Sequence, residues 1–304
     1  MSCPFLRETT VRTCHAAPSR KMIASGSNLD KDDKCLTPEH AQCQVFLERG
    51  GEQTGQCPNL DERMVQYCGA AQITRYVPYS PAEATHCGSE AYKYCDAYLA
   101  LARPHGPEAG TTQLDGFSVP EHLYYAPNHL WLDAGESGLC HVGVDGLLAR
   151  LLGKLDRVSF LTPQGTRRPT AVLTVCGVDW PLVFPCALQI DRSNSHLRAD
   201  PSRITQDPYG AGWLYAGWMP PGEDLAKMSA NLIHGRQAVA WMSQEALRLS
   251  EWVQRQLSVR LGEPQLACDG GWIVESVAHL LRREELLDVL HEFFAPYSGW
   301  TKES

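Results

Sequence analysis

The sequence predicts an α+β protein made of three consecutive regions: a duplicated four-cysteine metal domain, a central β-sandwich and C-terminal helices. Three observations support this fold class. Eight of the twelve cysteines lie before residue 96, short apolar runs alternate with turns in the middle, and apolar residues recur at helical spacing near the end. We place the three regions at 1–105, 121–220 and 221–304.

Length, charge and hydropathy limit the class of protein. A chain of 304 residues has room for two or three domains. The net charge of −8 argues against a nucleic-acid partner, because phosphate binding needs a basic face. No apolar run reaches the roughly 18 residues of a membrane span, and the segment from Met1 to Glu8 does not resemble a secretory signal. We therefore expect a cytoplasmic protein, where clustered cysteines more often bind metal than form disulfides.

The first region contains an internal repeat. In each copy a second cysteine follows the first after eleven positions, and the last two cysteines are eight positions apart. The first two cysteines are offset by 54 between the copies and the last two by 52, a difference that one loop can absorb. The repeated cysteines are Cys3, Cys14, Cys35 and Cys43 in the first copy, and Cys57, Cys68, Cys87 and Cys95 in the second.

Four thiols in so short a unit indicate a metal centre. A unit of about fifty residues buries little apolar surface, so a metal would help to stabilise it. Four cysteines suit either a 4Fe–4S cluster or a structural zinc ion. Because the tight C-x2–4-C knuckles typical of zinc are missing, we favour two 4Fe–4S clusters on the eight cysteines. Two zinc ions, or structural thiols that are reduced or disulfide-linked, remain the alternatives.

The assignment of cysteines to centres stays open. We expect the segment 4–13 to form a helix capped by Cys3, because proline suits the first helical position. A straight helix would separate Cys3 and Cys14 by roughly 16 Å, too far for one cluster. Either this segment bends, or the cysteines of one copy serve different clusters, as in two-cluster ferredoxins. The nearby histidines, which we interpret as surface or capping residues, are His15, His86 and His105.

The middle region is predicted to be mainly β-structure. The segment 106–120, rich in Gly, Thr and Pro, has the composition of a linker. The segment 145–153 is expected to form a short amphipathic helix that ends at Gly153. The runs that we expect to form strands are 129–132, 140–144, 157–161 and 171–175.

Several motifs in this region resemble those of the glycine cleavage system H protein. His129-Leu130-Trp131 is similar to the family's H-x-W opening, and Val142 to Asp145 followed by Leu152-Gly153 resembles its V-G-I-T…L-G helix. Asp207 to Leu214 is similar to the closing D-P-Y-G-x-G-W-L, with Asn194, Leu197 and Pro201 also in place. The resemblance covers roughly 121–220 and implies a lipoyl-carrier β-sandwich, a barrel-sandwich hybrid.

The lipoyl attachment site of that family is not reproduced. The resemblance places its E-S-x-K hairpin on Thr174 to Gly177, yet no lysine occurs between Lys154 and Lys227. We therefore expect no lipoate, and a degenerate hairpin that carries Cys176 and Gly177. These positions could dock a partner or bind a cofactor, but we favour small buried thiols for Cys176 and Cys186.

The C-terminal region is predicted to be helical. Apolar spacing indicates helices over 223–257 and 273–294, separated by a turn at 269–271. We expect these helices to pack on the sandwich. The alternative is a subunit-docking surface, because six of the eight tryptophans lie beyond residue 212 and aromatic residues are favoured at interfaces.

No catalytic motif was found: the chain lacks G-x-S-x-G, H-E-x-x-H, a P-loop and G-x-G-x-x-G. We therefore expect no catalytic site of its own. The favoured function is an iron–sulfur electron-transfer subunit or small redox protein, with two clusters in one compact domain as a relay. We expect its sandwich to dock it to protein partners that are subunits of a larger oxidoreductase complex. The alternatives are a zinc-stabilised scaffold or assembly protein without redox activity and, by analogy only, a regulator of a lipoyl-system enzyme.

Overall fold

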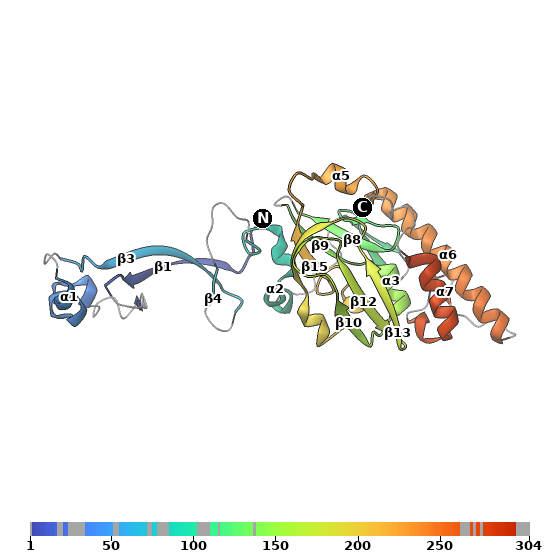
Figure 1. Cartoon of the computed structure of the whole chain (residues 1–304), viewed down its shortest axis with the longest axis horizontal. Helices are drawn as coiled ribbons and strands as arrows, with labels where there is room; N and C mark the ends of the chain where they lie inside the picture. Colours follow the sequence, from blue (N-terminus) through green and yellow to red (C-terminus); the bar gives the residue numbers. More distant parts are fainter. Residues whose placement is uncertain are drawn as a thin grey trace. The chain divides into compact units, whose positions relative to one another are not determined.

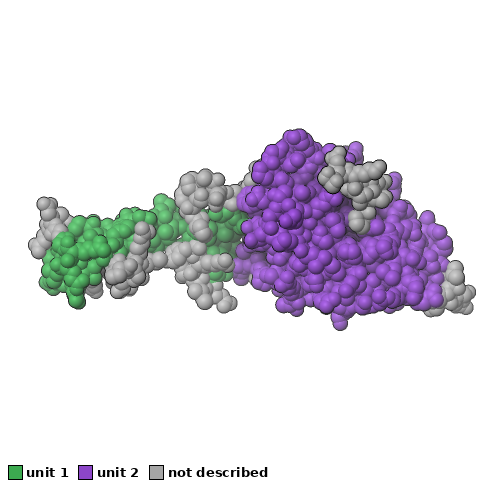
Figure 2. Space-filling view, viewed as in Figure 1, with its two compact units in different colours: residues 1–92 green, residues 93–304 purple. Residues whose placement is uncertain are grey.

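The structure is a computed structural model in two compact units, residues 1–92 and 93–304 (Figure 2). The expected sandwich and the expected C-terminal helices both belong to the second unit. His105, Gly270 and Gly271 lie outside the residues that the structure describes. The described residues are 2–16, 21–23, 34–50, 55–71, 75–77, 85–101, 110–114, 116–135, 138–261, 268–269, 272–273 and 276–295.

The first unit is built on a long antiparallel pair of strands. β1 (Leu6–Cys14) and β3 (Leu60–Cys68) run side by side for their whole length (Figure 1), from the pair Leu6–Cys68 to the pair Cys14–Leu60. The short strands β2 (Lys21–Ile23) and β4 (Arg75–Val77) complete a sheet of order β2-β1-β3-β4.

The helix expected over 4–13 is therefore wrong. The segment contains Thr9, Thr10, Val11 and Thr13, and β-branched side chains lose rotamer freedom in a helix but fit a pleated strand. Proline at the first position is compatible with a helix and does not require one.

The internal repeat is visible in the elements themselves. β1 and β3 have nine residues each and are offset by 54, as are β2 and β4. The short 3-10 helices η2 (Pro38–Gln42) and η3 (Glu90–Tyr94) are offset by 52. So are the helices α1 (Gln44–Arg49) and α2 (Asp96–Leu101). η1 (Lys34–Leu36) precedes η2 in the first copy. The structure thus has the same two offsets as the cysteines.

The second unit has two main sheets that enclose one core. The four expected strands of the middle region are confirmed as β8, β9, β10 and β12. The three-stranded sheet has the order β10 (Arg157–Phe160), β12 (Thr170–Val175), β13 (Val178–Val183). The seven-stranded sheet has the order β11 (Gly165–Arg167), β14 (Leu188–Ser193), β15 (Tyr215–Trp218), β9 (Leu139–Val144), β8 (Leu130–Ala134), β7 (Tyr124–Tyr125), β16 (Ile233–His234).

The expected helix in the middle region is confirmed as α3 (Gly146–Leu152). Asp145 caps its start by accepting a hydrogen bond from the backbone N–H of Leu148, and Gly153 follows its last residue with φ +60°. Two further short elements, η4 (Ser195–Arg198) and α4 (Arg203–Gln206), lie between β14 and β15.

The expected linker is wrong over its second half. β5 (Thr111–Leu114) and β6 (Phe117–Pro120) form an antiparallel hairpin, and Phe117 and Val119 are buried in the core. These two apolar residues alternate with polar ones, so a single face of β6 is apolar enough to pack. The Gly- and Thr-rich composition concealed this short pattern.

The C-terminal helices pack on the sandwich, as expected. α5 (Leu225–Ser229), α6 (Arg236–Leu261), η5 (Val277–His279) and α7 (Arg283–Phe294) all contribute to the same core as the sheets (Figure 1). The helix predicted over 223–257 is interrupted, because Ile233–His234 pairs with β7. Of the predicted turn at 269–271 only Asp269 is described; it ends the short strand β17 (Cys268–Asp269), which pairs with β18 (Trp272–Ile273).

A buried hydrogen bond between two side chains connects the start of α3 to the start of β8. His129 Nδ1 donates to Asp145 Oδ2 at 2.6 Å, and both side chains are completely buried. Asp145 uses its other oxygen to cap α3. The His129 ring lies between Trp241 of α6 and Phe294 of α7, at centroid distances of 4.8 and 4.9 Å. One aspartate therefore holds a helix, a strand and the C-terminal packing together.

The motif from Asp207 to Leu214 forms a tight turn. Trp131 donates its indole N–H to the carbonyl of Pro208 at 3.1 Å, and Gly143 leaves room for that ring, since a Cβ there would lie 2.6 Å from it. Asp207 accepts backbone N–H groups of Gly210 and Ala211, and Asn194 donates to the carbonyls of Ala211 and Trp213 in the same motif. The motif residues singled out in the sequence thus have structural roles.

Candidate functional site

The antiparallel pair of β1 and β3, which we call the ribbon, determines which repeated cysteines lie near each other. Cys14, at the end of β1, is paired with Leu60 at the start of β3. Leu60 donates its backbone N–H to the carbonyl of Cys57 at 3.1 Å, so Cys57 lies one turn before this point. The second cysteine of the first copy and the first cysteine of the second copy therefore share one end of the ribbon.

Two further cysteines join this end. Cys57 donates its backbone N–H to the carbonyl of Cys35 at 2.8 Å. Cys35 belongs to η1, and Cys43 follows η2 directly, with its N–H bonded to the carbonyl of His40. The backbone thus gathers Cys14, Cys35, Cys43 and Cys57, three from the first copy and one from the second.

The opposite end of the ribbon repeats this arrangement within the first unit. Cys68 is paired with Leu6, which donates to the carbonyl of Cys3 at 3.0 Å. Cys3 in turn donates its N–H to the carbonyl of Cys87 at 2.8 Å. Cys95, the sequence counterpart of Cys43, belongs to the second unit.

The first two cysteines of one copy are far apart. At about 3.3 Å per residue, the eight steps of β1 from Leu6 to Cys14 span roughly 26 Å. Of the two arrangements left open by the sequence, the extended strand is incompatible with a bend that joins Cys3 and Cys14. The cysteines of one copy are divided between the two ends.

The thiols themselves do not form a closed ligand set. Among the residues that the structure describes, no three His, Cys, Asp or Glu side chains converge closely enough to hold a metal ion. Cys3 and Cys57 are buried and the other six repeated cysteines are half-buried. The backbone brings the cysteines together, and metal ligation by their side chains remains a proposal.

One residue at this site was missed by the sequence reasoning. His40 is completely buried, and its Nδ1 lies 2.7 Å from the carbonyl of Thr37, to which it can only donate. Its buried Nε2 has no hydrogen-bond partner in the described part of the chain. A histidine held through Nδ1–H by a carbonyl is typical of metal ligands. Its position between Cys35 and Cys43 was the available signal.

The hairpin between β12 and β13 holds the second group of candidate residues. Cys176 and Gly177 form its two-residue turn, with φ values of +50° and +70°. Cys176 is exposed, so the expectation of a buried thiol is wrong at this position. The reason is that the two turn residues project beyond the sheet and its core.

Cys186 differs from Cys176 in its surroundings. Its thiol is half-buried and donates to the carbonyl of Met228 at 3.2 Å. Burial raises the pKa of Cys186 to about 11. Cys186 is therefore a protonated thiol near neutral pH, in agreement with a packing role.

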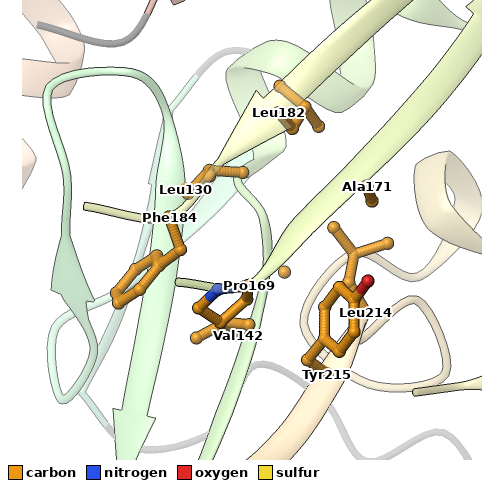
Figure 3. A pocket seen from close by; sticks show the side chains of 9 residues that line it. Leu130, Val142, Pro169, Ala171, Leu182, Phe184, Leu214 and Tyr215 are labelled. Atoms are coloured by element: carbon orange, nitrogen blue, oxygen red, sulfur yellow. The ribbon is translucent and has the colours of Figure 1, made fainter. Parts of the chain in front are cut away.

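The cavity in the sandwich offers no cofactor site. It has a volume of about 10 Å³, enough for one water molecule at most. Figure 3 shows that it is lined by apolar side chains of both sheets, among them Val142 and Leu182. The seam between the sheets is therefore packed core.

A prediction follows from the third buried thiol, Cys140. Burial and the nearby Asp133 carboxylate raise the pKa of Cys140 from 9.0 to about 12. Since the unfolded chain releases this proton near pH 9, the free energy of unfolding should fall between pH 9 and 12. Ionisation of this thiol should lower the free energy of unfolding by at most about 4 kcal/mol. Urea unfolding of wild type and Cys140→Ala at several pH values between 9 and 12 measures this loss. If the free energy of unfolding fell equally with pH in both proteins, the prediction would be contradicted.

Comparison with known proteins identifies the family of the second unit. Residues 123–245 match the family model described as glycine cleavage H-protein. A glycine cleavage system H protein from Salinibacter ruber is 33% identical over 104 residues, which cover 32% of this chain and 79% of the relative. The chain belongs to the glycine cleavage H-protein family. The match extends beyond the expected end at 220, into α6.

A further curated relative agrees with this assignment. A probable glycine cleavage system H protein 2 from Sulfolobus acidocaldarius is 27% identical over 128 residues, 40% of this chain and 83% of the relative. The crystal structure of an H protein from Mycobacterium marinum is 23% identical, with a TM-score of 0.33, and covers 41% of this chain and 99% of its own. No helix in the described ranges is long and apolar enough to cross a membrane.

Proposed function

We propose that this chain is an iron–sulfur electron-transfer subunit of a larger oxidoreductase complex, with its H-protein-like unit as the docking module. The observation that carries the proposal is the sorting of the repeated cysteines to opposite ends of the ribbon. A duplicated unit that places the same cysteines at each end has the organisation of a two-centre protein.

One centre is proposed to take Cys14, Cys35 and Cys43 of the first copy together with Cys57 of the second. The hydrogen bond from Cys57 to Cys35 and the pairing of Cys14 with Leu60 support this grouping. At the other end of the ribbon, the first unit offers the equivalent Cys68 and Cys87 of the second copy with Cys3 of the first. Cys95, in the second unit, is the counterpart of Cys43 by sequence alone. Each centre thus exchanges its first cysteine with the other copy.

The length of the ribbon changes the expected relay. The two ends of β1 are roughly 26 Å apart, and the rate of electron tunnelling falls steeply with distance. The expectation of two clusters in one compact domain is therefore replaced by centres that each exchange electrons with a cofactor of a partner.

The end of the second copy is built into the H-protein-like unit. Tyr94 stacks on His141 at a centroid distance of 4.0 Å and donates to Asp133 at 2.5 Å. Asp96 forms an ion pair with His196 at 2.9 Å. Cys95, between Tyr94 and Asp96, is thereby fixed to the surface of the module. These contacts support a docking role for the module, and we propose no lipoate on its Cys176-Gly177 turn.

Metal analysis of the full chain, purified without oxygen, tests the proposal. We expect about eight iron and eight sulfide ions per chain, because each 4Fe–4S cluster holds four of each. Dithionite should bleach the visible absorbance and produce a low-temperature EPR signal. Stoichiometric zinc without iron would contradict the iron–sulfur assignment.

A zinc-stabilised scaffold is the second candidate, and His40 is the observation that favours it. Mixed cysteine and histidine ligation is common at structural zinc sites, and the Nε2 of His40 is buried without a partner in the described structure. This candidate predicts a colourless protein whose first unit unfolds when a chelator removes the metal. Visible absorbance that dithionite bleaches would exclude it.

A further inference from the structure

The thiol at the tip of the β12–β13 hairpin lies beside a histidine of the C-terminal segment. Cys176 Sγ is 3.3 Å from His279 Nδ1, although the two residues are 103 positions apart in sequence. His279 Nε2 is 2.9 Å from the carbonyl of Lys154. Both side chains are exposed, so the pair is accessible to a small molecule. None of these residues takes part in the proposed metal centres.

The contacts determine which ring nitrogen of His279 carries the proton. A backbone carbonyl only accepts hydrogen bonds, so Nε2 must donate to Lys154. In the neutral ring, Nδ1 then has the free lone pair and accepts the proton of the Cys176 thiol. The Cys176 thiol, the His279 base and the Lys154 carbonyl that orients this base thus form a chain of hydrogen bonds, as at nucleophilic cysteines. The carbonyl of Ala278, 3.7 Å from the sulfur, is the thiol's other contact.

The charged groups around the pair come from three other elements. Asp156 accepts the N–H of Gly177 at 3.0 Å, and Arg283 donates to the carbonyl of Gly177 at 3.4 Å. Asp179 of β13 interacts with Arg157 and Arg283. Burial and the Asp156 carboxylate raise the pKa of Cys176. Little free thiolate therefore exists near neutral pH, so reaction there depends on a base that removes the proton.

We infer that Cys176 and His279 form a reactive thiol site that accepts small disulfides and is held as a mixed disulfide. His279 Nδ1 takes the thiol proton while Cys176 Sγ attacks one sulfur of the disulfide. A new S–S bond forms, the original S–S bond breaks, and the leaving thiolate takes the proton from the imidazolium. The disulfide is the oxidant, so the step balances without another reagent.

Small disulfides are the chemical class that this geometry fits. The site presents one sulfur and one histidine, which are too few ligands for a metal ion. The nearest other cysteine in sequence, Cys186, donates a hydrogen bond to the carbonyl of Met228 and does not form part of the turn. With no second thiol at the turn to resolve it, the mixed disulfide persists until an external thiol attacks.

Reaction of the full chain with 4,4′-dithiodipyridine tests the inference. Peptide mapping after short exposures would follow the mixed disulfide on Cys176 and on Cys186 in the same sample, between pH 7 and 9.5. We expect Cys176 to react at least about a hundredfold faster than Cys186 at pH 7. In His279→Gln the Cys176 rate should fall at least about tenfold at pH 7 and approach wild type at pH 9.5.

Two comparisons keep this test decisive. Arg283→Gln removes another contact to the same turn but no proton acceptor, so we expect its Cys176 rate to change less than about twofold. The Cys186 rate in every variant reports whether the sandwich is still folded. Equal loss at all pH values in His279→Gln would show that the histidine only holds the turn. That result, or a Cys176 as slow as Cys186, would overturn the inference.

Discussion

Cys57→Ser is expected to remove one of two metal centres and to lower the bound metal to about half of the wild-type content. Cys57 is buried and its backbone is bonded to Cys35 of the other copy. A serine hydroxyl is a poor substitute for a thiolate, so the centre at that end of the ribbon should be lost. The other end of the ribbon retains Cys3, Cys68 and Cys87 and should keep its metal. Iron, sulfide and zinc analysis of the purified full chain would measure the loss.

Double variants test the exchange of first cysteines between the copies. Cys14→Ser with Cys57→Ser should lose no more metal than Cys57→Ser alone, because both thiols belong to one proposed centre. Cys3→Ser with Cys57→Ser should lose nearly all of it. If each copy held its own centre, Cys14→Ser with Cys57→Ser would instead remove both. Cys186→Ser, whose thiol lies in the other unit, is the control and should keep the wild-type content.

Asp145→Ala is expected to destabilise the second unit by about 3–5 kcal/mol. Removal of the carboxylate leaves the completely buried His129 Nδ1 without its partner and removes the cap of α3. All eight tryptophans lie beyond residue 130, so urea unfolding followed by tryptophan fluorescence reports this unit within the full chain. The midpoint should shift to lower urea.

Asp224→Ala is the matched control for this prediction. Asp224 also caps a helix, accepting the backbone N–H of Lys227 at 2.8 Å, but its side chain is exposed and has no buried histidine partner. Its loss should therefore cost only about 1 kcal/mol. Asp145→Asn, which keeps an acceptor for His129, should fall between the two alanine variants. Equal effects of the two alanine variants would show that burial of the pair contributes nothing.

Much of the local structure could be predicted from the sequence. The strands β8, β9, β10 and β12 and the helix α3 follow from short-range patterns of apolar and turn residues, whereas the motif that begins at Asp207 was recognised from a family resemblance. The hairpin β5–β6 and the strand β1 were missed, since glycine-rich composition and an N-terminal proline outweighed weaker β-signals there.

The sequence by itself determined the repeat, because eight cysteines in register can be counted along one chain. Only the tertiary structure decided how those cysteines are grouped, because antiparallel pairing of β1 with β3 turns one copy against the other. It likewise brought His279 to Cys176. Neither contact has a local signal: each depends on backbone that is distant in sequence and is brought close only when sheets and helices pack.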